Sequence, residues 1–311
     1  MSDRLAVLML HRFATCPQHT KGHSPTDLRS VLALLRASGV RLLSLDEAIA
    51  EYLHGDRSGA AGGPAVCFTV DDGYRDFMDA GLPTFEAFDC PVTCFIVPDV
   101  IDGKTWFWWD RLDFMLRRLP ADQLALNVQG ERFEVRRSTN EYSWQRPAVS
   151  MLKGRTEAFR ADFLAELEAR ANVAIPSDVP EEYRVMTWDA IRECETRGVR
   201  FGAHSLSHPV LSQVSSTSAE QEILGSVQRL KTELRNPSSV FCYPYGLASD
   251  FGSREVEILR AGGVTHAVSA MPGLIGPSAE KGAELGELPW RIPRFAFDGR
   301  PAMALRQLLI A

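Results

Sequence analysis

No apolar run in this sequence is long enough to cross a membrane. A transmembrane helix needs about 20 consecutive apolar residues, whereas the apolar segment nearest the N-terminus, Leu5–Leu10, has only six. Six residues are also too few for the core of a signal peptide. We therefore expect a cytoplasmic protein without a transmembrane segment.

An excess of basic charge is missing as well. The 311 residues carry 34 Lys and Arg against 40 Asp and Glu, a formal net charge of -6. Because a nucleic-acid-binding surface needs a basic stripe, we expect no nucleic-acid partner. The composition is otherwise that of an ordinary globular protein, with 45% hydrophobic and 24% charged residues. A chain of this length can bury a core without disulfides or a structural metal.

Cysteines are few, and their spacing matches neither a zinc knuckle nor a thioredoxin motif. Several lie inside apolar, strand-like runs, where free cysteine behaves as a small hydrophobic residue. We expect reduced thiols, largely in the core, rather than disulfides or metal ligands. The six positions are Cys16, Cys67, Cys90, Cys94, Cys194 and Cys242.

Short apolar runs alternate with helical patterns along most of the chain. This alternation predicts an α/β fold in which a parallel sheet is connected by helical crossovers. Seven runs favour a barrel, complete or incomplete, over an open sheet, although the pattern alone separates the two poorly. The runs are Leu5–Leu10, Ala65–Val70, Val92–Val97, Val199–Ala203, Val240–Tyr243, Val264–Ala270 and Ile292–Phe297.

One stretch, from about 99 to 184, breaks this rhythm. It contains an aromatic-rich segment, a hairpin-like pair of runs and a charged helical pattern over Arg155–Ala171. The hairpin is predicted between Leu124–Val128 and Arg132–Val135, joined at Gln129-Gly130-Glu131. We interpret the stretch as an insertion between barrel elements.

Two adjacent carboxylates, Asp71 and Asp72, follow the apolar run Ala65–Val70 and precede Gly73. At the carboxyl end of a barrel strand, both acids would lie where barrel enzymes place their sites. Two neighbouring like charges resist joint ionisation unless a cation or a donor holds them. Taken alone, the pattern fits a solvated turn almost as well.

A second strand-like run ends in His204-Ser205-Leu206-Ser207-His208. Two histidines four residues apart can converge on one metal ion, and neutral imidazole is a common nitrogen ligand. With Asp72 they form a two-histidine, one-carboxylate set that leaves coordination positions open, as catalytic sites require. Zinc is our first choice for the divalent metal, with nickel, cobalt and iron as alternatives.

The ligand set alone does not fix the reaction, because ferrous oxygenases use the same donors. Asp71 favours a hydrolase, since it could take the proton from an attacking water. A turn at Tyr243-Pro244-Tyr245 could aim backbone N–H groups at a developing oxyanion, although an ordinary aromatic turn is equally consistent. His11 ends the first strand-like run and could act as a general acid.

Together these motifs resemble those of the polysaccharide deacetylase family (NodB homology, carbohydrate esterase family 4). Thr69-Val70-Asp71-Asp72-Gly73 is similar to its first motif, Thr-Phe-Asp-Asp-Gly, with Val70 in place of phenylalanine. His204–His208 matches the second, His-Ser/Thr-x-x-His, and Cys242–Tyr245 resembles the third, Arg-x-Pro-Tyr.

The resemblance implies a single domain over residues 1–311, a distorted (β/α)7 barrel with an inserted α+β segment at about 99–184. It also implies one divalent metal, roles for the motif residues, and an amino sugar or glycan precursor as substrate. The implied ligands are Asp72, His204 and His208, the base is Asp71, and the backbone N–H of Tyr245 is the oxyanion donor.

Two departures from the family pattern matter. The arginine that steadies the base is replaced by Cys242, and we expect Arg291 to supply the charge, with Arg294 as the alternative. The C-terminal Leu-x-His is absent, since no histidine follows His266. Met9-Leu10-His11 resembles it in permuted form, as in the poly-N-acetylglucosamine deacetylase branch, which makes His11 the expected acid.

The activity implied is metal-dependent hydrolysis of an N-acetyl or N-formyl group, a carbon–nitrogen bond that is not a peptide bond. Three alternatives stay open from the sequence. One is a metal-dependent hydrolase of another small-molecule C–N bond, and one is a degenerate carbohydrate-binding relative. The third is an oxygenase. The identity of the substrate and the oligomeric state are not predicted.

Overall fold

The computed structural model describes residues 4–14, 22–56, 62–137, 145–276 and 287–300. The chain divides into two compact units: unit 1 is Met1–Asp102 with Val185–Ala311, and unit 2 is Gly103–Arg184. All five cysteines within the described ranges are free and buried, as expected, and Cys16 lies outside those ranges. None of the described helices combines the length and hydrophobicity that a membrane crossing requires.

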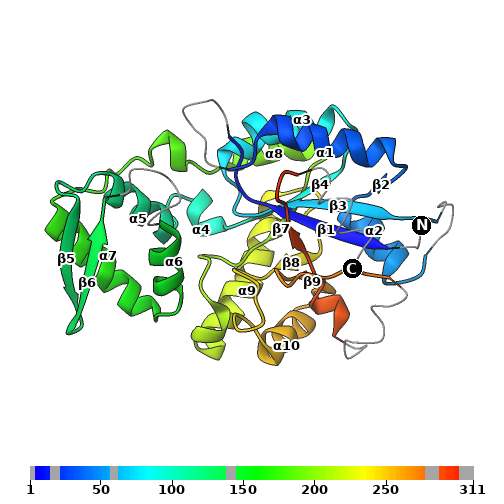
Figure 1. The fold of residues 1–311 in the computed structure, drawn as a ribbon. Coiled ribbons are helices and arrows are strands. Elements are labelled where there is room, and N and C mark those ends of the chain that lie inside the picture. The colour runs from blue at the N-terminus through cyan, green and yellow to red at the C-terminus, as the bar shows by residue number, and fades with distance from the viewer. Residues whose placement is uncertain (1–3, 15–21, 57–61, 138–144, 277–286, 301–311) are drawn as a thin grey trace. The chain divides into compact units, whose positions relative to one another are not determined.

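Unit 1 is built on a parallel sheet that curls into a half-barrel (Figure 1). The strands lie in the order β10-β1-β3-β4-β7-β8-β9, with β2 paired to β3. This confirms the predicted α/β fold, and each of the seven apolar runs contains one of the strands in that order. Their bounds are β1 Leu5–Leu10, β2 Arg41–Leu42, β3 Ala65–Val70, β4 Val92–Ile96, β7 Arg200–Ala203, β8 Val240–Cys242, β9 His266–Val268 and β10 Phe295–Ala296.

The segment that ends in β10 contacts both edges of the curled sheet. Ile292 forms a parallel bridge with Val268 of β9, and Phe295 pairs in parallel with Leu8 of β1. This segment therefore brings its side chains next to the first and the last of the other strands, which matters for the site below.

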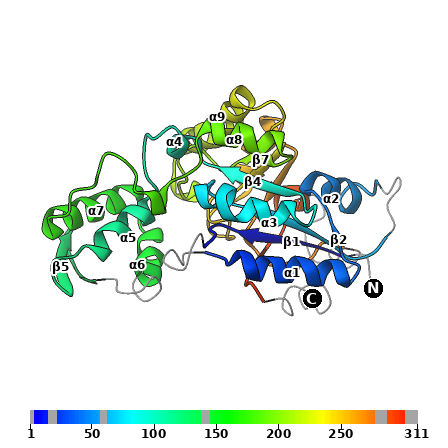
Figure 2. The same ribbon diagram turned by 90° about the horizontal axis from the view of Figure 1, so that it is seen from above.

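Apart from the helix at Leu45–Tyr52, the longer helices of unit 1 follow one another around the outer face of the sheet (Figure 1, Figure 2). Ion pairs join successive helices, Arg197 with Glu86 between α8 and α3 and Arg192 with Glu233 between α8 and α9. The bounds are α1 Pro25–Ala37, α2 Leu45–Tyr52, the π-helical turn Phe77–Gly81, α3 Leu82–Glu86, α4 Pro98–Ile101, α8 Trp188–Thr196, α9 Ser216–Glu233 and α10 Ser253–Ala261. Short 3-10 turns occupy Leu211–Gln213 and Leu288–Trp290.

Local sequence explains where several of these helices begin. The side chains of Ser44, Thr187 and Ser215 each accept a hydrogen bond from the backbone three residues on. Such caps satisfy N–H groups that have no partner within the helix. Ser44 also forms a capping box with Glu47 at the start of α2.

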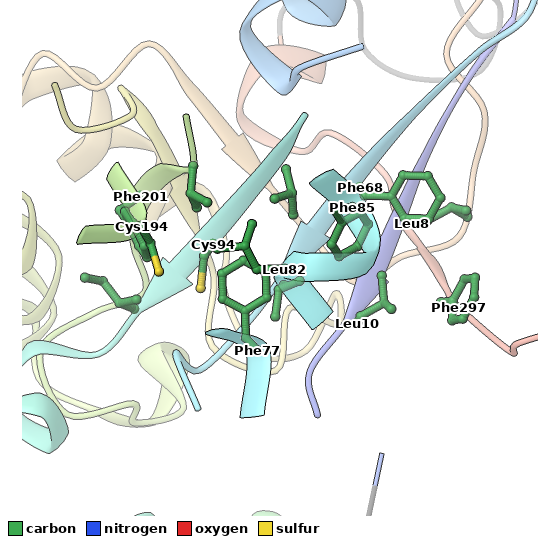
Figure 3. Packing of buried hydrophobic residues seen from close by; sticks show 14 of the residues in the cluster. Leu8, Leu10, Phe68, Phe77, Leu82, Phe85, Cys94, Cys194, Phe201 and Phe297 are labelled. Carbon is green, nitrogen blue, oxygen red and sulfur yellow. The ribbon is translucent and has the colours of Figure 1, made fainter. Parts of the chain in front are cut away.

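The two faces of the sheet are both apolar, as expected for parallel strands covered on both sides. One row of alternating side chains packs under the outer helices; Figure 3 labels Leu8, Leu10, Phe68, Phe77, Leu82, Phe85, Cys94, Cys194, Phe201 and Phe297 of this cluster. The other row, which includes Val7, Cys67 and Cys242, packs with α2 on the opposite face. Because successive side chains of a strand point to opposite faces of the sheet, Thr69 and Asp71 lie on the same face as Cys67.

Unit 2 has a separate hydrophobic core between its helices and an antiparallel hairpin. The hairpin turns at Gln129 and Gly130, both with positive φ, which suits the twist of a two-residue turn. Tyr183 donates a hydrogen bond to the buried carboxylate of Asp113 at 2.7 Å. The elements are α5 Trp108–Arg117, β5 Gln123–Val128, β6 Glu131–Arg136, α6 Gln145–Lys153, α7 Glu157–Ala171 and the 3-10 turn Glu181–Tyr183.

Candidate active site

The predicted site residues of unit 1 follow the carboxyl ends of different strands. His11 follows β1, Asp71 and Asp72 follow β3, His204 follows β7, and Tyr245 comes after β8. Because the strands are parallel, their carboxyl ends all lie at the same end of the half-barrel. The fold thereby brings together side chains that are far apart in the sequence.

Asp72, His204 and His208 form a compact set of buried donor atoms. The Nε2 atoms of the two histidines lie 3.2 Å apart. Asp72 Oδ1 lies 3.7 Å from His204 Nε2 and 3.5 Å from His208 Nε2. All three side chains therefore converge on one point, as the sequence predicts.

These spacings fit a tetrahedral divalent cation. Zinc bonds of about 2.0–2.1 Å at tetrahedral angles separate neighbouring ligand atoms by about 3.3 Å. His204 Nδ1 donates to the carbonyl oxygen of Cys242 at 2.8 Å, which leaves the Nε2 lone pair directed at the other two donors. Burial lowers the pKa of His204 to about 4 and that of His208 well below its usual value, so both rings are in the neutral form that ligates metals.

A second group of donor atoms, Asp71, His204 and Cys242, is also compact, but it does not suit a cation. The guanidinium of Arg294 already contacts both Asp71 and Cys242. Burial raises the pKa of the Cys242 thiol well above its usual value, so that side chain is not the thiolate a metal would bind. The set that contains Asp72 is therefore the candidate metal site.

Left-handed backbone conformations are concentrated at this site. Asp72, Ser205, His208 and Tyr245 have φ values of 74°, 61°, 65° and 60°. Non-glycine residues adopt this region seldom, and clusters of such residues mark functional sites. At Asp72 the turn continues through Gly73, also at φ 74°, where an added Cβ would lie 2.8 Å from Ile96.

Asp71 is held by the arginine that the sequence analysis gave as the alternative. Arg294 donates from Nη1 to Asp71 Oδ1 and from Nη2 to Asp71 Oδ2, both at 2.8 Å. Its remaining donors reach Thr69 Oγ1, the carbonyl oxygen of Ser269 and the sulfur of Cys242. Arg294 is only 1% exposed, so the ion pair is buried and two-pronged.

The choice of Arg291 was wrong. Its side chain is 26% exposed and pairs with Glu287 four residues earlier, at 2.7 Å, and its guanidinium lies near the ring of Phe251. Arg291 belongs to the irregular stretch that follows a 3-10 turn, where side-chain direction does not alternate as it does in a strand.

The electrostatics around Asp71 keep it ionised. Burial raises the pKa of this carboxyl, but Arg294, His204 and His11 together lower it far more, to well below its usual range. Conversely, burial opposes the charge of Arg294, while Asp71 raises its pKa. A carboxylate held in this way is ready to accept a proton without first having to lose one.

His11 lies beside Asp71 and is partly exposed to solvent. Its Nε2 atom is 4.0 Å from Asp71 Oδ2, and 46% of its side chain is exposed. Desolvation by the surrounding atoms lowers the pKa of His11; Asp71 opposes that effect and Arg294 adds to it. Tyr245 is half-buried beside the ligand set, with its ring edge-on to that of His208 at 4.8 Å between centroids.

Two supporting acids were not found from the sequence. Asp76 is buried, accepts from the backbone N–H of Phe13 at 3.1 Å and pairs with Arg12, so it anchors the segment just after His11. Glu222 of α9 accepts from the loop between the two histidine ligands. No local pattern marks either residue, because each acts on a segment distant in the sequence.

Comparison with known proteins supports the resemblance inferred from the motifs. Residues 154–265 match the family model described as polysaccharide deacetylase. That span contains His204, His208 and Tyr245, whereas Asp71 and Asp72 precede it. No curated protein sequence matches the chain.

Several solved structures share the fold. One is the deacetylase PplD of Streptococcus pyogenes in complex with acetate, at 14% identity and a TM-score of 0.62 over 99% of each chain. Another is IcaB from Ammonifex degensii, at 19% identity and a TM-score of 0.57, covering 99% of this chain and 98% of the other. The deacetylase domain of BpsB from Bordetella bronchiseptica aligns at 16% identity with a TM-score of 0.53, covering 95% and 98%.

At 14–19% identity, these structures show a shared fold and nothing more. The likeness in sequence rests on the family-model match over residues 154–265. In family-model match and in architecture, this chain resembles the polysaccharide deacetylases, as its motifs predict, and that resemblance implies removal of acetyl groups from carbohydrate.

Proposed function

We propose that this chain is a metal-dependent hydrolase that removes an N-acetyl or N-formyl group from an amino sugar or glycan precursor. The observation that carries the proposal is the juxtaposition of two groups. Asp72, His204 and His208 form a buried donor set with zinc-like spacing. Beside it lies Asp71, a second carboxylate kept ionised by Arg294.

Asp72, His204 and His208 would hold the cation, with zinc as the first candidate. A divalent ion bound there would polarise the amide carbonyl and lower the pKa of a water molecule toward about 7. Asp71 then takes one proton from the attacking water. Its two hydrogen bonds to Arg294 fix the orientation of the carboxylate throughout.

The remaining steps fall to Tyr245 and His11. As water adds to the amide carbon, the backbone N–H of Tyr245 donates to the developing oxyanion. The lowered pKa of His11 makes the ring neutral at pH 7, so it needs a proton before it can act as an acid. Asp71, 4.0 Å away, passes on the proton it has taken, and His11 delivers it to the leaving amine as the C–N bond breaks.

The test combines metal analysis with product release. The purified chain should contain about one zinc-class ion, and acetate release from N-acetylglucosamine oligomers should stop after chelation and return on metal addition. Asp71→Asn should keep the metal and lose about 100- to 10,000-fold in kcat, the range of a general base. Its melting temperature must be checked, because the change removes the partner of a buried arginine.

Three results would point elsewhere. Asp71→Asn with wild-type turnover contradicts the assigned base. A chain that binds the oligomers and the metal but releases neither acetate nor formate is a binding protein. Activity on small cyclic amides with none on N-acyl sugars indicates a different C–N hydrolase.

A further inference from the structure

We propose that Glu222, on the outer helix α9, is a positioning residue that sets the spacing of His204 and His208. The proposal rests on the metal site of the proposed function and adds a residue outside the motifs. It follows from the contacts that hold the five-residue loop His204–His208, whose first and last residues would bind the same ion.

Glu222 accepts three hydrogen bonds from the middle of this loop. Its Oε2 atom accepts from the backbone N–H of Leu206 at 2.8 Å and from that of Ser207 at 2.9 Å. Its Oε1 atom accepts from the hydroxyl of Ser207 at 2.6 Å. One carboxylate therefore satisfies two adjacent backbone donors and one side chain, a geometry that fixes the loop more tightly than one contact would.

A second observation places α9 against the same loop. Gly225 follows Glu222 by one helical turn and lies on the same face of α9. A Cβ added at Gly225 would lie 2.7 Å from the Cδ1 atom of Leu206. Glycine costs a helix interior about 1 kcal/mol relative to alanine, and here its small size admits the loop's leucine.

Other hydrogen bonds also hold the loop. In its middle, the backbone N–H of Asp99 donates to the carbonyl oxygen of Leu206 at 3.0 Å. The backbone N–H of His204 donates to the carbonyl oxygen of Ile96 at 3.0 Å, which extends the sheet. The backbone N–H of His208 donates to Ser205 Oγ at 3.0 Å. Ser205 and His208 both have positive φ, so the loop needs outside support to remain in this conformation. Between the two histidines, Glu222 holds two backbone N–H groups and the Ser207 hydroxyl, while the Asp99 N–H holds one carbonyl oxygen.

Two conservative variants test whether Glu222 acts through its hydrogen bonds or through its charge alone. Glu222→Gln loses the charge but keeps an oxygen that can accept from both amides, and its NH2 group can donate to Ser207 Oγ. Glu222→Asp keeps the charge but is shorter by one methylene and cannot reach all three donors. Glu220→Asp is the matched control, since Glu220 is exposed on the same helix.

Each variant is purified without metal, and three quantities are measured. These are the melting temperature of the metal-free protein, the Kd for Zn²⁺ by chelator competition, and the visible absorption spectrum with Co²⁺, which reports ligand geometry. We expect Glu222→Asp to weaken Zn²⁺ binding about 10- to 100-fold, the usual loss when a residue behind a ligand is altered. Its Co²⁺ spectrum should change as well.

Glu222→Gln should stay within about threefold of the wild type and retain the Co²⁺ spectrum, because its hydrogen bonds are preserved. Glu220→Asp should be indistinguishable from the wild type. The reverse order, with Gln impaired and Asp intact, would overturn the proposal by assigning the effect to charge. Equal zinc affinity and spectra in all variants would also overturn it. A wild-type chain that binds no metal would instead refute the proposed function.

Discussion

Two pairs of histidines occupy opposite ends of the same half-barrel. His204 and His208, the carboxyl-end pair, have Nε2 atoms 3.2 Å apart. His54, which follows α2, and His266, the first residue of β9, form the amino-end pair, with Nε2 atoms 3.0 Å apart. Both pairs have rings edge-on to one another. By imidazole spacing alone, the two pairs are alike.

Their surroundings differ in ways that decide function. The carboxyl-end pair is buried and has the carboxylate of Asp72 within 3.7 Å of both Nε2 atoms. In the amino-end pair His54 is exposed and His266 Nδ1 lies 2.8 Å from the hydroxyl of Thr265. Within the described ranges, no third His, Cys, Asp or Glu completes a metal set around the amino-end pair. A third, charged donor and the burial of both rings therefore distinguish the candidate metal site from the amino-end pair.

Removal of the third donor should produce the largest effect. Asp72→Asn keeps the shape of the side chain but loses the charge that binds a cation. Zinc affinity should fall by more than about 100-fold, beyond the loss that follows from changing a residue behind a ligand. Equilibrium dialysis against Zn²⁺ measures it.

The matched control is the double variant His54→Gln, His266→Gln, which removes the amino-end pair. Its zinc stoichiometry and affinity should equal those of the wild type. If the double variant loses the ion and Asp72→Asn keeps it, the contrast drawn between the two ends is reversed.

The second prediction concerns the two arginines beside the carboxyl end. Arg294→Met leaves the buried charge of Asp71 without its partner, which should cost about 3–5 kcal/mol of unfolding free energy and nearly all turnover. Arg291→Met removes a partly exposed pair with Glu287, worth about 0–1 kcal/mol, and should leave kcat almost unchanged. Urea unfolding and acetate release separate them, and equal effects of the two changes would be inconsistent with the assignment of Arg294.

These arginines also show which site residues could be predicted from the sequence and which could not. Motifs next to strands were predictable, because a strand fixes which end its following residues occupy; Asp71, Asp72 and the carboxyl-end pair are examples. Arg291 and Arg294 stand three apart in a segment without regular alternation, so nothing local indicates which one faces Asp71. The structure resolves it through the pairing of that segment with both edges of the sheet.

Contacts between distant segments were harder still. His54 and His266 lack any shared motif, and neither has a neighbour in sequence that suggests the other. Glu222 lies on a helix whose pattern predicts only an amphipathic element. The fold class and the candidate ligands were thus accessible from patterns, whereas the residues that orient them depend on tertiary packing, which no local pattern encodes.

The smallest expected effect belongs to the amino-end pair and depends on pH. Burial, and then His54, lower the pKa of His266 below its usual value, while Asp46 opposes them. The unfolded chain therefore binds a proton more readily than the folded one. The stability that His266 contributes is thus present above about pH 6.5 and declines on acidification toward the lowered folded pKa.

At pH 7.5, His266→Gln should lower the free energy of unfolding by about 1 kcal/mol, the net value of one hydrogen bond. Near pH 5 the wild type should lose most of that advantage, as measured by urea unfolding at both pH values. Because the carboxyl-end histidines titrate in both proteins, the difference between wild type and variant isolates His266. A cost that grows on acidification would mean that the amino-end pair prefers its charged form, and the two pairs would then differ in electrostatics as well as in ligation.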